Sequence, residues 1–133
     1  MAFQYGVALR NAQVSQIQTV VAAAGTSNMQ LRIYSGAEPA DCGTTASGTL
    51  LATIVLPASF LTSSGGTTTL AGTWSVAAST TGTAGYFRIY DMAGTPVCHV
   101  QGNVTTDLVL NNTSITATQT VSVTTFGVTA GNA

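Results

Sequence analysis

The chain carries very little charge. Only 5% of its 133 residues are charged: there are three arginines, no lysine and four acidic residues, for a net charge of -1 at pH 7. An ordinary soluble domain has roughly 25% charged residues. Neutralising phosphates requires clustered Lys and Arg, so this composition argues against a nucleic-acid partner. Weak repulsion between copies favours association, and we expect partners to cover much of the surface.

Membrane spans, leader sequences and disulfide frameworks are also not predicted. No run approaches the roughly 18 consecutive apolar residues of a membrane span. The N-terminus lacks a basic segment followed by a long apolar stretch, so we expect no secretory leader and a protein that stays in the cell that makes it. The two cysteines, Cys42 and Cys98, lie far apart in the sequence. They predict two free thiols in a reducing cytosol, with one late-forming bridge as the alternative.

Residues able to carry out chemistry are few and scattered. His99 is the only histidine and follows Cys98, so on a strand the two side chains point to opposite faces. No serine lies in the pattern of a nucleophile elbow, and the Gly65-Gly66 pair lacks the Lys-Ser/Thr of a phosphate loop. The acidic residues show no metal-binding spacing; they are Glu38, Asp41, Asp91 and Asp107. We therefore expect no enzyme, no catalytic residue, no cofactor and no metal.

One helix is predicted, at residues 8–24. This segment is rich in alanine and free of Gly and Pro, and Gly25 supplies a stop. We expect an apolar stripe to pack on a sheet, with docking to a partner as the alternative role of the helix. The stripe consists of Leu9, Ala12 or Gln13, Gln16 or Ile17, Val20 and Val21.

From residue 25 onward, short alternating runs separated by turn clusters predict strands. We place them near 29–35, 49–56, 68–77, 84–91, 96–101, 107–110 and 118–128, with turns at 37–43, 62–67, 92–95 and 111–113. This spacing is typical of an antiparallel sandwich, a jelly roll or a small barrel. The fold class predicted is mainly β: a single-domain antiparallel β-sandwich, jelly-roll-like, with an N-terminal α-helix. The domain spans 1–133, with the helix at 8–24, the sandwich at 29–128 and a tail at 129–133.

Two of the predicted strands share a motif: residues 31–34 read Leu-Arg-Ile-Tyr and residues 87–90 read Phe-Arg-Ile-Tyr. Alternation places Phe87 and Ile89 on one face, where they are candidate core anchors together with Trp74. Arg88 and Tyr90 lie on the other face.

The polar face of these strands has two possible roles. Each arginine could pair with an acid across the sheet, Arg88 with Asp107 or Arg32 with Asp91. Alternatively, the arginines project into solvent with Tyr34 and Tyr90 and meet another subunit, because Tyr and Arg are enriched at interface hot spots.

The order of motifs along the chain resembles a group of small tailed-bacteriophage virion proteins of the capsid module. The segments that carry the resemblance are 7–12, 31–39, 48–53, 72–74, 82–91 and 119–123. The resemblance implies a structural decoration or cement protein, made in the host cytoplasm and bound at the capsid surface of the virion. Its partners would be the major capsid protein and further copies of itself, as dimers or trimers. A tail or fibre module is the alternative, followed by a carbohydrate-binding module, which would need exposed aromatics beyond Tyr34 and Tyr90.

Overall fold

The N-terminal helix is shorter than predicted. The computed structural model describes residues 4–23, 25 and 29–129. Helix α1 spans Val7–Val21 and is preceded by Gly6 in an extended conformation. It ends where the Ala22 N–H donates to Gln18 O at 2.9 Å and Gly25, at φ = 124°, donates to Ala22 O at 3.0 Å. The helix thus stops at Val21, three residues before the predicted end at residue 24, and Gly25 lies in the turn that follows it. Residues 24 and 130–133 lie outside the described residues, and residue 129 of the predicted tail instead ends the last strand.

Ten strands follow within the described residues: β1 Met29–Ser35, β2 Leu50–Val55, β3 Leu61–Ser64, β4 Thr67–Leu70, β5 Ser75–Ala77, β6 Gly82–Asp91, β7 Val97–Asn103, β8 Leu108–Leu110, β9 Ser114–Ile115 and β10 Thr120–Thr129. The predicted turn at 62–67 is instead a hairpin of β3 and β4, because Gly65 and Gly66 both adopt positive φ. The predicted strand at 68–77 is interrupted at Gly72, where φ is 76°. The short strand β9 was not predicted.

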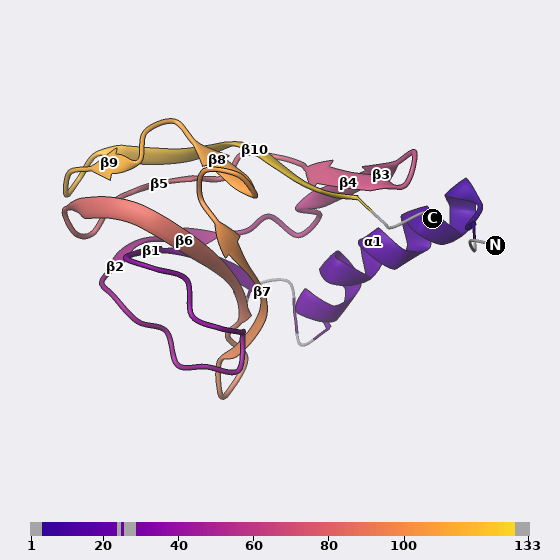
Figure 1. The fold of residues 1–133 in the computed structure, drawn as a ribbon, viewed down its shortest axis with the longest axis horizontal. Helices are drawn as coiled ribbons and strands as arrows, with labels where there is room; N and C mark the ends of the chain where they lie inside the picture. Colours follow the sequence, from indigo (N-terminus) through magenta and orange to yellow (C-terminus); the bar gives the residue numbers. More distant parts are fainter. Residues whose placement is uncertain (1–3, 24, 26–28, 130–133) are drawn as a thin grey trace.

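The strands form two antiparallel sheets packed face to face, which confirms the predicted β-sandwich. The first sheet has the order β2-β1-β6-β7, with β9 paired to β6, and the second has the order β3-β4-β10-β5, with β8 paired to β10. Figure 1 shows the two layers, with α1 beside them below β3 and β4. A jelly-roll-like connectivity stays a prediction.

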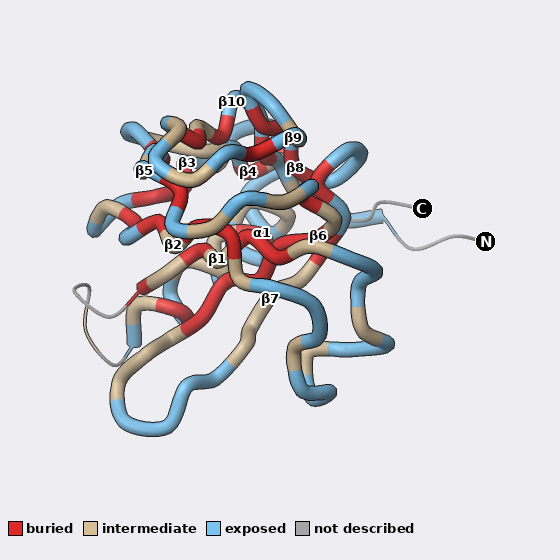
Figure 2. Tube along the Cα trace, turned by 90° about the vertical axis from the view of Figure 1, so that its left-hand side faces the viewer, coloured by how far each residue is buried: buried red, intermediate tan, exposed pale blue. Residues whose placement is uncertain are grey.

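The core lies between the sheets, where Figure 2 shows the buried residues gathered. The three predicted core anchors, Trp74, Phe87 and Ile89, are all there and are at most 1% exposed. Phe126 of β10 joins the layers: its ring lies 5.4 Å from that of Trp74 and 5.7 Å, edge-on, from that of Phe87. Burying a large apolar side chain of this kind contributes about 1.5–3 kcal/mol, so these rings are a main source of stability.

Helix α1 packs on the sheets through only part of the predicted stripe. Val21 of the stripe is buried and Ile17 packs against the core, as does the buried Val14 outside the stripe, whereas Leu9 and Val20 are 51% and 45% exposed. The outer part of the predicted packing face was wrong because polar side chains orient the helix.

Two of these polar side chains bind the β3–β4 hairpin directly. Gln18 Oε1 accepts from the Leu61 N–H at 2.8 Å, and Asn11 Oδ1 accepts from the Gly66 N–H at 2.7 Å. Because β3 is an edge strand, its N–H groups need acceptors from outside the sheet. The helix therefore turns Asn11 and Gln18 toward the hairpin and leaves part of its apolar surface outside.

Candidate functional site

The two copies of the Arg-Ile-Tyr motif lie side by side. Strands β1 and β6 pair antiparallel, with Arg32 directly opposite Arg88 and Tyr34 directly opposite Tyr86. The rings of Tyr34 and Tyr86 stack, with centroids 5.1 Å apart. Like charges directly opposite one another destabilise a sheet, so each guanidinium needs partners of its own.

Arg88 is 2% exposed, and its hydrogen bonds go to neutral oxygens. Its Nη2 donates to the backbone oxygens of Asp41 and Thr44, at 3.1 and 2.6 Å. Its Nε donates to Gln101 Oε1 at 3.1 Å, and its Nη1 donates to the Tyr90 hydroxyl at 3.2 Å. Carbonyl and hydroxyl dipoles thus take the place of a counter-ion.

Neither predicted role of Arg88 matches these surroundings. Instead of pairing with Arg88, Asp107 Oδ2 accepts from the Asn103 N–H at 2.9 Å, in the turn after β7. Burial also prevents the Arg88 side chain from meeting another subunit. The sequence could not show the carbonyls that receive it, because those backbone atoms lie more than 40 residues away in the chain.

Arg32 also lacks the predicted acidic partner. Its Nε and Nη2 donate to Gln30 Oε1 at 3.3 and 3.2 Å, and its guanidinium lies 5.3 Å from the centre of the Tyr90 ring. Asp91 Oδ1 instead accepts from the Ala93 N–H at 2.9 Å. Tyr90 therefore interacts with both arginines: its ring face lies under the Arg32 guanidinium, and its hydroxyl accepts a hydrogen bond from Arg88.

Residues 36–49, which we call the covering loop, lie over this polar face of the first sheet. The Tyr86 hydroxyl donates to Ser47 O at 2.6 Å, and Gln101 Nε2 donates to Pro39 O at 2.8 Å. Tyr34 and Tyr90 are only 7% and 8% exposed. Burial, followed by a hydrogen bond with Tyr90, raises the pKa of Tyr34 to about 12. The face predicted to meet another subunit is largely covered by the chain itself.

The covering loop also brings the two cysteines together. The Sγ atoms of Cys42, in the loop, and Cys98, on β7, lie 2.8 Å apart. Both cysteines are free in the structure and partly exposed. Their separation of 56 residues conceals this contact in the sequence.

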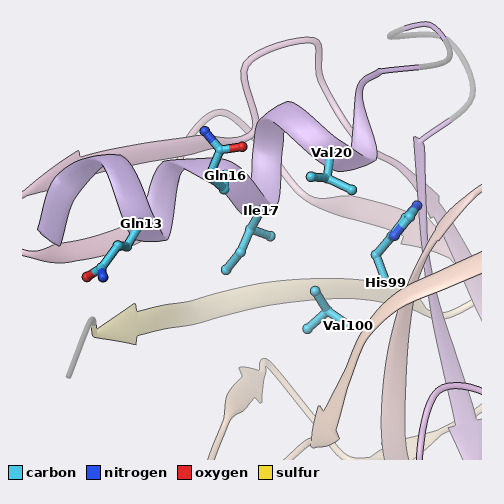
Figure 3. Close-up of a pocket in the computed structure, with 6 residues that line it drawn as sticks. All are labelled: Gln13, Gln16, Ile17, Val20, His99 and Val100. Atoms are coloured by element: carbon cyan, nitrogen blue, oxygen red, sulfur yellow. The ribbon is translucent and has the colours of Figure 1, made fainter. Parts of the chain in front are cut away.

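A hollow of about 240 Å³ separates α1 from the edge strand β7. As Figure 3 shows, Ile17 and Val20 of the helix face His99 and Val100 of β7 across it, and Gln13 and Gln16 complete its lining. His99 lines the hollow, whereas the neighbouring Cys98 packs against the buried tyrosines on the other face of the sheet. The prediction that Cys98 and His99 point to opposite faces is therefore confirmed. The exposed residues Leu9, Gln13, Gln16 and Val20 follow one another at intervals of four, three and four. They form a single stripe on α1, which we call the outer stripe.

The described residues lack both a metal-binding cluster and a membrane-spanning helix. Groups of three or more His, Cys, Asp or Glu side chains positioned to hold a metal ion were not found in that part of the chain. Among the same residues, no helix has both the length and the apolar character needed to cross a membrane.

Comparisons of the chain with protein-family models, with curated proteins and with solved structures found no match.

Proposed function

We propose that this chain is a structural protein that acts through subunit contacts, as a decoration or cement protein on the capsid surface of a virion. Its partners are the major capsid protein and further copies of itself. The role requires many weak, repeated contacts and no chemistry.

The observation that carries the proposal is the outer stripe of α1. Leu9 and Val20 are about half exposed, although buried positions for apolar side chains exist on the same helix. Val20 lines the hollow together with Ile17 and Val100, and Leu9 continues the outer stripe beyond Gln13, which also lines it. Exposed apolar surface of this kind is typical of an interaction site.

The distribution of charge supports a neutral partner surface. Two of the three arginines, Arg32 and Arg88, are engaged with groups of the first sheet and the covering loop. Among the described residues, His99 is the only titratable one that lines the hollow. A contact here depends on burial of apolar surface and on amide hydrogen bonds, so we expect it to be insensitive to salt.

The alternative of a tail or fibre module uses the same fold and the same surface. A carbohydrate-binding module has less support, because it would need exposed aromatics beyond Tyr34 and Tyr90, and even these two are buried.

The proposal predicts that Val20→Asp weakens attachment to capsids prepared without the protein. We expect binding to fall at least tenfold, because a carboxylate would be desolvated in an apolar contact. The matched control is Val109→Asp on β8, a similarly exposed valine in the second sheet, which should bind like the unaltered protein. Co-sedimentation with expanded capsids measures both variants.

The same capsids test the function itself. Capsids carrying the protein should break at a higher temperature than capsids without it, and equal robustness would contradict the cement role. Immunogold label at the tail tip of intact virions would instead establish the tail alternative.

A further inference from the structure

The two thiol sulfurs already lie close to bonding distance. The separation of 2.8 Å between the Sγ atoms of Cys42 and Cys98 is less than 1 Å longer than a disulfide bond, which is about 2.05 Å. The two side chains point toward each other, since Cys98 Sγ donates to Cys42 Sγ. Little movement of the backbone is needed to join them.

The segment around Cys42 is held in place on both sides. The backbone oxygens of Asp41 and Thr44, which flank the cysteine, both accept from Arg88 Nη2. Asp41 Oδ1 also accepts from the N–H and the hydroxyl of Thr44, at 2.8 and 3.0 Å. Cys98 is fixed by the pairing of β7 with β6, where it lies opposite Tyr90. The two sulfurs are therefore brought together by the fold and not by chance encounter.

We propose that Cys42 and Cys98 are a redox-active pair that forms an intramolecular disulfide with a small disulfide oxidant such as glutathione disulfide, and that this bond fastens the covering loop to β7. One molecule of glutathione disulfide is reduced to two molecules of glutathione as the two protein thiols are oxidised to one disulfide. The inference is independent of the proposed function.

The order of the two steps follows from the surroundings of the sulfurs. Burial, followed by the hydrogen bond with Cys42, raises the pKa of Cys98 to about 12, so Cys98 keeps its proton. The Cys42 sulfur is therefore the one that attacks the oxidant; a mixed disulfide forms, the S–S bond of the oxidant breaks, and the thiol proton passes to the departing first glutathione. Cys98 then loses its proton to solvent and attacks the sulfur of Cys42, which releases the second glutathione. Both cysteines are partly exposed, so a small oxidant can reach them.

The bond should make the folded protein more resistant to heat. A crosslink between residues 56 positions apart removes much of the conformational freedom of the unfolded chain. We expect the melting temperature of the oxidised protein to exceed that of the reduced protein by roughly 10 °C.

The sequence allows a direct test with trypsin. Since the chain has three arginines and no lysine, complete cleavage separates a peptide of residues 33–88, with Cys42, from one of residues 89–133, with Cys98. After the full-length protein has been treated with glutathione disulfide and alkylated, the two peptides should appear as one linked species. They should separate on reduction, and the intact mass should show the loss of two hydrogen atoms.

The controls are Cys42→Ser and Cys98→Ser, which keep the side chains small and leave one thiol each. Neither variant should gain thermal stability on oxidation. A stable glutathione adduct on both cysteines, a disulfide between two chains, or no reaction would overturn the proposal. An internal disulfide without a rise in melting temperature would overturn the proposed fastening of the loop.

Discussion

Arg88 is a buried cation whose hydrogen bonds are all to neutral oxygens, and it connects three parts of the chain. Its guanidinium joins β6 to Gln101 of β7 and to the covering loop at Asp41 and Thr44. Hydrogen bonds from a charged donor are stronger than neutral ones, and an acceptor left buried without a donor costs about 1–3 kcal/mol. Removing the Arg88 guanidinium would leave the Gln101 side-chain oxygen and the backbone oxygens of Asp41 and Thr44 without this donor, and the cost of those unpaired acceptors sets its contribution to stability.

Replacing Arg88 by methionine should therefore lower the free energy of unfolding by about 3 kcal/mol or more. The matched control is Arg32→Met, directly opposite on β1, where the partly exposed guanidinium donates to Gln30 and lies over the Tyr90 ring. We expect that change to cost about 1 kcal/mol or less. Urea denaturation of both variants measures the difference, and equal losses would show that Arg88 does not hold the loop.

At the scale of elements, the covering loop reaches the first sheet through a close approach of two backbones. A Cβ atom at Gly85 of β6 would overlap the carbonyl oxygen of Gly36, where the loop leaves β1. The pairing of β1 with β6 is irregular at the same place, between Tyr34 and Ser35. A bulge there turns the chain across the sheet, and glycine at position 85 leaves room for it.

The variant Gly85→Ala should consequently lose about 3 kcal/mol of stability, because the new methyl group has to displace backbone. For comparison, Gly94→Ala places a methyl group in open space, although φ is 70° there, and should cost about 1 kcal/mol. Thermal unfolding followed by tyrosine circular dichroism reports on both variants, since the stacked Tyr34 and Tyr86 lie next to the loop. If Gly94→Ala were the more damaging change, the close approach would not matter to the fold.

At the scale of the whole molecule, one apolar cluster draws on both sheets and on the helix. It contains Ile33 and Phe87 from the first sheet, Phe126 from the second and Val21 from α1. Elements that share one core lose their packing together, which favours cooperative unfolding.

We therefore expect a single unfolding transition, as the predicted single domain requires. Trp74 is the only tryptophan and is buried among Phe60 and Phe126, so its fluorescence reports on the core. Its transition in urea should coincide with that of the backbone followed by far-ultraviolet circular dichroism. In Val21→Ala both should shift together to lower urea by the same amount, corresponding to a loss of about 1–2 kcal/mol. Two separated transitions would show that the helix or one sheet unfolds independently.

The sequence by itself determined the fold class, most of the strands and the core anchors. These depend on local pattern: alternation in β6 places Phe87 and Ile89 on the same face of the strand whatever the other strands do. Only the tertiary structure decided which face of α1 is buried, which oxygens surround Arg88 and that Cys42 meets Cys98. Each of these depends on segments distant in the chain: the hairpin N–H groups select the helix face, and the covering loop supplies carbonyls and a sulfur from more than 40 residues away. Hydrophobic periodicity does not predict which distant backbone N–H or C=O group a side chain will meet, because nearly every residue offers the same backbone groups. It also does not predict which loop brings one cysteine to another.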